Sequence, residues 1–253
     1  MPYITEYTPL TQQEQRQLTF KRRYKQETPA WDDSMVLLTT LVRQRLCGGE
    51  SVIDFGCGRG NFVIDELRDL FSSVQGFDAS AEATRGNTTC QHIQIGGGEG
   101  LPFAAESANV VLSLWVFEHL AKPAEVLAEI YRVLVPGGFV AFVTPNKHSL
   151  LISLRRILSD NTARRLLKMF YGREEEDAFP VYYRANTVSG IVSLAREAGF
   201  IPEVVQENVD PSYTSFGVMS YFLSRIFSRF GGSLARPHLV VVLRKPGAIE
   251  KSC

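Results

Sequence analysis

The sequence predicts an α/β domain in which a parallel β-sheet carries helices on both faces. The first observation is an alternation of short apolar runs, typical of buried strands, with segments of helical spacing. The second is a glycine-rich run at 56–60, which directly follows a predicted strand and precedes a predicted helix. The third is length, because 253 residues are enough for one such domain with insertions.

The composition argues against several classes of protein. Basic and acidic residues balance at 27 each, so nothing in the charge favours nucleic-acid binding. The four cysteines form no CxxC pair, and we predict no metal site. The first residues lack the basic and apolar regions of a signal peptide, and no apolar run is long enough to span a membrane. We therefore expect a cytoplasmic location.

Strands and helices are predicted along the chain from periodicity and from turn residues. The predicted strands are 51–55, 73–77, 92–95, 108–114, 139–144, 201–209 and 238–244. The predicted helices are 34–45, 61–71, 81–85, 123–133 and one that Asn186-Thr187 caps and Gly199 ends. Residues 11–27 are polar and charged, and either a helix over the domain or a partly disordered segment is consistent with them.

The run from Ser51 to Asn61 combines a strand, three glycines at alternate positions and the start of a helix. Glycine adopts positive φ and has no side chain, so this loop can turn sharply and expose its backbone to a ligand. A dinucleotide fingerprint needs glycine where Asn61 stands, and the carboxylate of Asp54 would repel a pyrophosphate. A ligand with a positive amino group and no phosphate fits better, and S-adenosyl-L-methionine is such a ligand.

Three later segments agree with this interpretation. One predicted strand ends at Asp78, about 20 residues after the loop, where an acid can bind ribose hydroxyls. The others are 98–103 with 109–120, and 134–146. Together the four segments resemble the core of class I S-adenosylmethionine-dependent methyltransferases, in the group that includes the ubiquinone-biosynthesis C-methyltransferases. The resemblance covers about 51–146, with a weaker echo at 183–200.

The resemblance implies a Rossmann-like sheet of seven strands with helices on both faces, a helical cap, and an antiparallel pair of final strands. It also implies a set of cofactor-binding residues. They are Asp54, Gly56, Cys57, Gly58, Gly60, Asp78, Ala79, Ser80, Gly98, Glu99, Ser113, Leu114 and Trp115. The alternatives are a ligand-free turn for the glycines, a surface acid for Asp78 and a core position for Trp115. Gly97 stands where the family often has an acid for adenine, so the backbone of Gly98 and Glu99 would replace that contact.

Two histidines are candidate bases. His119 follows Glu118 in a segment that matches the family's Glu-His pair, and His148 follows Pro145-Asn146 at the same end of the predicted sheet. A histidine can accept a proton near neutral pH, whereas a structural role is the alternative for the pair. The sequence leaves open whether the reaction uses a base at all.

The chain is predicted to contain an N-terminal helical lead-in or lid at 1–47 and the methyltransferase domain at 48–253. Helical insertions are expected near 148–172 and 210–236, each with apolar residues at helical spacing among arginines. Three roles are consistent with the insertions: ordinary domain helices, a cap that encloses a substrate, or helices that lie on a membrane surface.

The predicted activity is methyl transfer from S-adenosyl-L-methionine to a small-molecule acceptor at oxygen, nitrogen or carbon. The apolar second insertion adds lipid-like and glycolipid acceptors to the candidates. A nicotinamide-dependent oxidoreductase is the alternative from another enzyme class, and a protein that binds the cofactor without turnover is the non-catalytic one. The sequence predicts neither the identity of the acceptor nor the oligomeric state.

Overall fold

The fold is described by a computed structural model, which covers residues 12–97, 100–157, 179–215 and 217–247. These residues form two compact units, each of which is described on its own. Unit 1 contains 12–34, 146–157, 179–180, 207–215 and 217–238, and unit 2 contains 35–97, 100–145, 181–206 and 239–247. Both units therefore draw on segments that are far apart in the sequence.

Strands and helices alternate along most of the chain, as the sequence predicts. The strands are β1 (Glu50–Phe55), β2 (Phe71–Asp78), β3 (His92–Ile95), β4 (Ala108–Leu114), β5 (Leu134–Pro145), β6 (Ile201–Asn208) and β7 (His238–Arg244). The α-helices are α1 (Gln12–Glu27), α2 (Ser34–Arg43), α3 (Phe62–Glu66), α4 (Pro123–Val133), α5 (Leu150–Ile157), α7 (Val188–Glu197) and α8 (Val218–Phe230). Short 3₁₀ helices are η1 (Arg68–Leu70), η2 (Phe117–His119), η3 (Pro211–Tyr213) and η4 (Gly232–Ala235).

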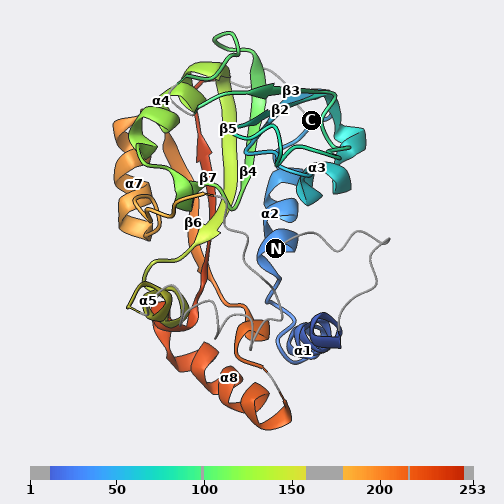
Figure 1. Cartoon of the computed structure of the whole chain (residues 1–253), viewed down its shortest axis with the longest axis vertical. Coiled ribbons are helices and arrows are strands. Elements are labelled where there is room, and N and C mark those ends of the chain that lie inside the picture. The colour runs from blue at the N-terminus through green and yellow to red at the C-terminus, as the bar shows by residue number, and fades with distance from the viewer. Residues whose placement is uncertain (1–11, 98–99, 158–178, 216, 248–253) are drawn as a thin grey trace. The chain divides into compact units, whose positions relative to one another are not determined.

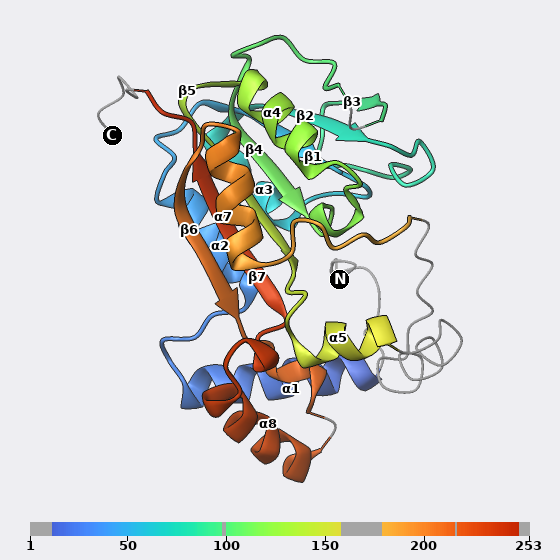
Figure 2. The same ribbon diagram turned by 90° about the vertical axis from the view of Figure 1, so that its left-hand side faces the viewer.

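The strands form one seven-stranded sheet in the order β3-β2-β1-β4-β5-β7-β6 (Figure 1). The pairs β2–β3, β1–β2, β1–β4 and β4–β5 are parallel, and Asp54 of β1 lies opposite Gly76 of β2. Strand β7 runs antiparallel to β5, because Lys245 just after β7 exchanges backbone hydrogen bonds with Gly137 and Gly138 at the start of β5. Figure 2 shows β6 antiparallel to β7 as well. The predicted class I sheet is thus confirmed.

Helices cover both faces of the sheet in unit 2, with α4 and α7 on one face and α2 and α3 on the other (Figures 1 and 2). Because side chains alternate along a strand, β1 sends Ile53 to the first face and Val52 to the second. Aromatic residues strengthen the first face, where Phe117 stacks on Phe142 with ring centroids 3.8 Å apart. On the second face, Leu38 of α2 is fully buried.

Helix α7, which lies within the weaker part of the resemblance, has the ends that the sequence predicts. The side chain of Thr187 accepts a hydrogen bond from the Gly190 N–H at 3.0 Å and so caps the N-terminus of α7. The chain leaves the helix before Gly199, whose φ of +92° is in the left-handed region that favours glycine.

Two predicted helices are wrong in detail. The helix predicted at 61–71 is divided into α3 and η1, because the backbone leaves helical geometry at Leu67. The segment predicted as a short helix at 81–85 consists of turns. Its side chains bind nearby backbone groups instead: the Ser80 hydroxyl accepts from the Ala83 N–H at 3.2 Å, and the Thr84 hydroxyl donates to the Ala81 carbonyl at 3.0 Å.

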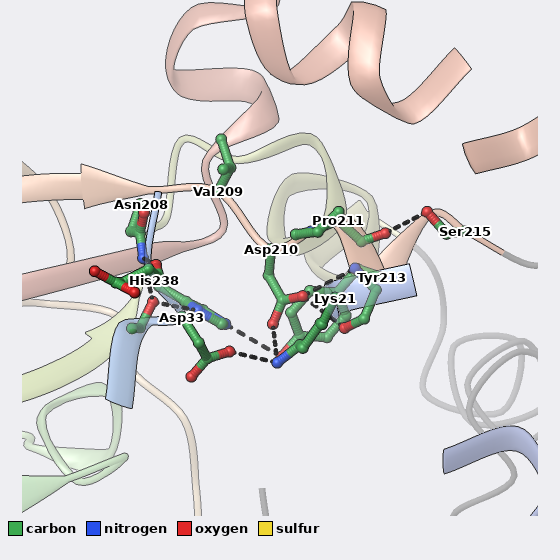
Figure 3. Close-up of polar contacts among 12 residues, drawn as sticks. Lys21, Asp33, Asn208, Val209, Asp210, Pro211, Tyr213, Ser215 and His238 are labelled. Carbon is green, nitrogen blue, oxygen red and sulfur yellow. Dashed lines mark hydrogen bonds and ion pairs between the residues drawn. The ribbon is translucent and has the colours of Figure 1, made fainter. Parts of the chain in front are cut away.

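Unit 1 is held together by aromatic packing and by a cluster of ion pairs. Figure 3 shows the ion pairs. Phe20 of α1 stacks on Tyr221 of α8, with ring centroids 5.2 Å apart. The ammonium of Lys21 lies 2.5 Å from a carboxylate oxygen of Asp33 and 3.0 Å from one of Asp210. Burial alone would lower the pKa of Lys21, but the two carboxylates outweigh it and hold that pKa above its ordinary value.

His238 is another buried titratable group of unit 1. Its two ring nitrogens lie 3.0 Å from the Ser34 hydroxyl and 3.2 Å from the Tyr213 hydroxyl. Burial lowers the pKa of His238 to about 4, so the ring is neutral in the folded protein near pH 7.

The described parts of the N-terminal segment and of both predicted insertions belong to unit 1. Helix α2, which the sequence analysis groups with the lead-in, packs into the core of unit 2 from Met35 onward. The lid and cap roles stay predictions. In the part of the chain that the structure describes, no helix is long and apolar enough to cross a membrane.

Candidate functional site

The glycine loop lies at the carboxyl end of β1 in unit 2. Gly56, Gly58 and Gly60 all adopt positive φ, at +74°, +39° and +139°. A Cβ on Gly56 would lie 2.2 Å from a methyl carbon of Val116, so no larger residue fits there. A Cβ on Gly58 would meet nothing within 4 Å. The loop therefore needs Gly56 for its own packing, whereas Gly58 leaves open space in which a ligand can approach the backbone.

Polar residues before β3 support this loop, and the sequence analysis did not single them out. The Asn87 side-chain amide donates to the carbonyl oxygens of Gly58 at 2.8 Å and of Cys57 at 3.2 Å. The Thr89 hydroxyl accepts the Asn61 N–H at 3.1 Å, and it lies 2.7 Å from where a Cβ on Gly60 would stand. Gly60 thus makes room for Thr89. The polar run that follows Gly86 is the feature of the sequence that could have indicated these loop-supporting residues.

Asp54 and Asn61 connect the end of β1 to the start of α3. The Asn61 amide donates to Asp54 at 2.7 Å, while its side-chain oxygen accepts the Val63 N–H at 3.1 Å and caps α3. Burial raises the pKa of Asp54 to about 7, and the hydrogen bond from Asn61 opposes that rise. Through these contacts Asp54 orients the start of α3 and the loop before it.

Asp78, at the end of β2, is bound to the same loop. Its carboxylate accepts the Gly58 N–H at 2.9 Å through one oxygen and the Ser80 N–H at 2.9 Å through the other. Among the described residues, no lysine or arginine forms an ion pair with Asp78 or Asp54. Two acidic side chains thus flank the loop without a neutralising cation, which favours a ligand with positive charge. Ala79 is exposed and follows Asp78.

The two cysteines near the loop are free thiols that pack beside Gly76. A Cβ on Gly76 would lie 2.9 Å from the sulfur atoms of both Cys57 and Cys90. The contact with Cys90, together with burial, raises the pKa of the Cys57 thiol. Cys57 is therefore a neutral packing residue beneath the loop, and a thiolate nucleophile is not favoured there.

The end of β4 carries a buried hydroxyl and a strained backbone. Ser113 is fully buried, and its hydroxyl oxygen has no hydrogen-bond partner among the described residues. Trp115 has a φ of +60°, which is rare for a large side chain, and its N–H donates to the Val143 carbonyl at 3.0 Å. Leu114 and Trp115 are half-buried against the second face of the sheet, so both roles considered for Trp115 remain open.

A second polar cluster of unit 2 surrounds Glu118. The Thr144 hydroxyl donates to the Glu118 carboxylate at 3.0 Å and accepts from the Asn186 amide at 2.7 Å. Burial raises the pKa of Glu118. Asn186 is buried, and its side-chain oxygen has no partner among the described residues. His119 is half-buried in η2 directly after Glu118.

In the sequence, Asn186 is recognisable only as part of a helix start, and Thr144 belongs to a predicted strand without a functional signal. No local sequence motif indicates their contact with Glu118. The three residues come together only when η2, the end of β5 and the segment before α7 are assembled.

One predicted site residue belongs to the other unit, and two lie outside the described residues. His148 belongs to unit 1, where it is exposed and its N–H donates to the Asn146 side chain at 3.0 Å. Gly98 and Glu99 lie outside the described residues. Within the described ranges, no group of three or more His, Cys, Asp or Glu side chains is arranged to hold a metal ion.

Comparisons with known proteins match this region of the chain. Residues 53–142 match a family model described as a methyltransferase domain. The chain is 36% identical over 114 residues to a protein of Mycolicibacterium smegmatis named as a probable S-adenosylmethionine-dependent methyltransferase, across 42% of this chain and 44% of that protein. It is 29% identical over 127 residues to a ubiquinone biosynthesis O-methyltransferase of Nitrosococcus oceani, across 47% and 53% respectively.

A crystal structure of an S-adenosylmethionine dependent methyltransferase from Mesorhizobium loti has the same fold. It superposes with a TM-score of 0.55 at 18% identity and covers 81% of this chain and 96% of that chain. The chain spans about half the length of the curated relatives that it matches.

Proposed function

Because residues 53–142 match a family model described as a methyltransferase domain, we propose that the chain transfers a methyl group from S-adenosyl-L-methionine to a small-molecule acceptor. The observation that supports this most is the glycine loop between the acidic side chains of Asp54 and Asp78, with no paired cation among the described residues. Such a site favours a ligand with cationic groups and disfavours a pyrophosphate. A nicotinamide-dependent oxidoreductase is correspondingly disfavoured.

Residues at the carboxyl ends of β1 and β2 would hold the cofactor. When bound, S-adenosyl-L-methionine supplies a methyl group activated by a sulfonium. We assign Asp78 to the ribose hydroxyls, because each carboxylate oxygen can accept more than the one hydrogen bond given by Gly58 or Ser80. The backbone at Gly58 would contact the ligand, and Asp54 would act through Asn61 by fixing the loop.

The residues around Glu118 are our candidates for the acceptor side. Orienting the acceptor and removing its proton are the tasks that the protein performs in such a transfer. The unpartnered oxygen of Asn186 can accept a hydrogen bond. The backbone carbonyl of Glu118 accepts the backbone N–H groups of Tyr182 at 2.8 Å and Tyr183 at 3.1 Å. We propose His119 as the base where the acceptor needs one. His148 as a base stays a prediction.

The proposed acceptor is a small organic molecule, and lipid-like or glycolipid acceptors are included because unit 1 exposes apolar side chains. The printed name of the Nitrosococcus relative gives an oxygen acceptor for that protein. For this chain the methylated atom stays open among oxygen, nitrogen and carbon, and the cytoplasmic location stays a prediction.

Calorimetric titration tests the cofactor part of the proposal. The ligands are S-adenosyl-L-methionine, S-adenosylhomocysteine and NADH, and the proteins are wild type, Asp78→Ala and the control Asp69→Ala, which removes an exposed acid. We expect both adenosyl ligands to bind wild type and the control, and Asp78→Ala to bind them at least about tenfold more weakly, as for one lost charged hydrogen bond. Binding of NADH alone would contradict the proposal.

Turnover is tested separately from binding. Release of S-adenosylhomocysteine is measured with phenols, carboxylic acids and prenylated quinols as acceptors. We expect release with at least one class, and slower release with His119→Gln for an acceptor that must lose a proton in the reaction. Cofactor binding without release for any class would favour the non-catalytic alternative.

A further inference from the structure

The outward face of α8 is apolar. Its apolar positions recur at helical spacing, so their side chains share one face of the helix. These residues are Val218, Met219, Phe222, Leu223, Ile226 and Phe230. Every one of them is exposed, from 45% for Ile226 to 78% for Phe230. Contiguous apolar surface of this kind on a globular protein marks a site of interaction.

The opposite face of α8 carries its serines. Ser220, Ser224 and Ser228 are spaced four residues apart, and none of them is on the exposed apolar side. Ser224 is 4% exposed, and its hydroxyl lies 2.7 Å from the Thr214 hydroxyl. A surface helix ordinarily buries its apolar face and exposes its polar one. Helix α8 is oriented the other way round.

Specific contacts hold α8 in this orientation. Tyr221 is 1% exposed and stacks on Phe20 of α1, and its hydroxyl donates to Glu27 at 2.8 Å. Arg225 adds an ion pair with Glu27 at 2.9 Å. Rolling the helix to bury its apolar face would break all of these contacts, so the exposed face is a built feature of unit 1.

The charge on α8 is entirely positive. The helix contains Arg225 and Arg229, which are four residues apart at one edge of the apolar face, and it contains no acidic residue. The Arg229 guanidinium lies 5.7 Å from the centre of the Phe230 ring, and within the described residues it forms no ion pair. An apolar face bordered by arginines complements an anionic surface.

Helix α5, also in unit 1, carries further exposed apolar side chains. It contacts η4, which follows α8 directly. Leu150 and Leu154 of α5 are 43% and 47% exposed, and Leu234 of η4 is 52% exposed. Exposed apolar side chains of unit 1 therefore lie on α8, α5 and η4. A fluid phase such as the acyl chains of a bilayer can accommodate an irregular apolar surface of this kind.

We propose that the outward faces of α8 and α5 bind an anionic lipid bilayer, with the apolar side chains among the acyl chains and Arg229 at the lipid phosphates. Such helices lie in the interface with their apolar face about 5–10 Å deep. A second copy of this chain fits less well, because in a twofold pair the arginines of one α8 would face a helix without any acid. The proposal requires neither cofactor nor acceptor, so it stands apart from the proposed function.

Vesicle flotation of the full chain tests the proposal. The vesicles are phosphatidylcholine alone, and phosphatidylcholine mixed with phosphatidylglycerol. The double variant Phe222→Ser/Phe230→Ser is compared with Ile95→Ser/Ile201→Ser, which removes two apolar side chains of unit 2 that are 49% and 52% exposed. We expect wild type and the control to float with the mixed vesicles, and the phenylalanine variant to bind about a hundredfold more weakly.

A charge-reversal variant separates the electrostatic contribution to vesicle binding from the apolar contribution. Arg229→Glu is expected to lower binding to the mixed vesicles at least about tenfold, because each basic residue at an anionic surface contributes on its own. The control Arg85→Glu changes an arginine of unit 2 whose side chain is 77% exposed, and it should bind as wild type does. Circular dichroism melting shows whether each variant is folded.

Three results would overturn the proposal. One is absence of flotation of a folded wild type with both kinds of vesicle. Another is equal binding by wild type and the phenylalanine variant. The third is concentration-dependent dimerisation in analytical ultracentrifugation that the phenylalanine variant abolishes while vesicles bind neither protein, which would assign the face to a second copy.

Discussion

The two units treat buried charge in opposite ways. In unit 1, the buried ammonium of Lys21 is matched by the carboxylates of Asp33 and Asp210. In unit 2, Asp54 and Asp78 accept hydrogen bonds from amide and backbone groups, and no described cation pairs with either. The compensated charges of unit 1 stabilise its fold. The uncompensated charge of unit 2 is what a site for a cationic ligand requires.

The chain offers one fluorescent reporter for each unit, which makes the comparison measurable. It contains two tryptophans, Trp31 in unit 1 and Trp115 in unit 2. The Trp31 indole donates to the Val209 carbonyl at 3.1 Å, so its emission reports on the packing of unit 1. A Trp115→Phe background follows unit 1, and a Trp31→Phe background follows unit 2.

The largest expected effect is that of Lys21→Met. Removing the cation leaves the buried carboxylate of Asp210 beside the partly buried carboxylate of Asp33, which costs about 3–5 kcal/mol of unfolding free energy. Denaturant titration of Trp31 emission measures the loss. The control is Lys25→Met, whose ion pair with Asp32 joins side chains that are 44% and 36% exposed, and it should cost less than about 1 kcal/mol. Equal losses of unfolding free energy in the two variants would show that the ion pairs of Lys21 do not stabilise unit 1.

The next effect is a pH dependence in unit 2. Burial raises the pKa of Asp54 from 3.8 to about 7, so the folded protein keeps a proton that the unfolded chain releases above about pH 4. The free energy of unfolding should therefore fall as pH rises from about 4 to 7, by up to about 4 kcal/mol, and level off above. Asp54→Asn should remove that slope when Trp115 emission is followed. An unchanged slope in the variant would assign it to other groups.

Unit 1 should respond to pH in the opposite direction. Burial lowers the pKa of His238 from 6.5 to about 4, so the unfolded chain binds a proton that the folded protein does not. The free energy of unfolding should fall as pH decreases from about 6.5 to 4, by up to about 3 kcal/mol. His238→Gln keeps a hydrogen-bonding side chain and should flatten the curve read from Trp31. A free energy of unfolding that increases as pH decreases would contradict the burial of a neutral His238 ring.

The smallest difference is expected between two glycines of the loop. Gly56→Ala and Gly58→Ala both place a Cβ at positive φ, which costs about 1 kcal/mol. Only the first also collides with Val116, and it should cost about 2 kcal/mol more. Trp115 emission in denaturant measures both. Gly58→Ala should instead weaken cofactor binding with little loss of stability, and the reverse pattern would mean that Gly58 faces no ligand.

The sheet and most element boundaries could be predicted from the sequence, because local periodicity and turn residues determine them. Strands β3 and β4 and helix α4 have the predicted bounds. The segment 81–85 was predicted wrongly, since the hydroxyls of Ser80 and Thr84 replace the hydrogen bonds that a helix would make. That competition depends on side-chain geometry, which periodicity does not register.

Less of the candidate site could be predicted. The glycines and Asp78 belong to one contiguous motif and its neighbouring strand, so spacing together with the family resemblance selected them as candidates. The supports of the loop, Asn87 and Thr89, act across a turn. Unpartnered groups such as the Asn186 oxygen become visible only after the sheet is assembled. The outward orientation of α8 likewise depends on Tyr221 and its partners, and a hydrophobic pattern does not show which face is buried.

The most direct test of the central claim compares S-adenosyl-L-methionine with S-adenosylhomocysteine, which lacks the methyl group and the sulfonium charge. Their affinities are measured by calorimetry across the pKa of Asp54, at about 7, for wild type and Asp54→Asn. We predict that the preference for the sulfonium ligand increases as Asp54 ionises, and that this increase is absent in the variant. A preference that does not change with pH, or that changes equally in both proteins, would contradict the claim that the uncompensated acids of unit 2 select a cationic cofactor.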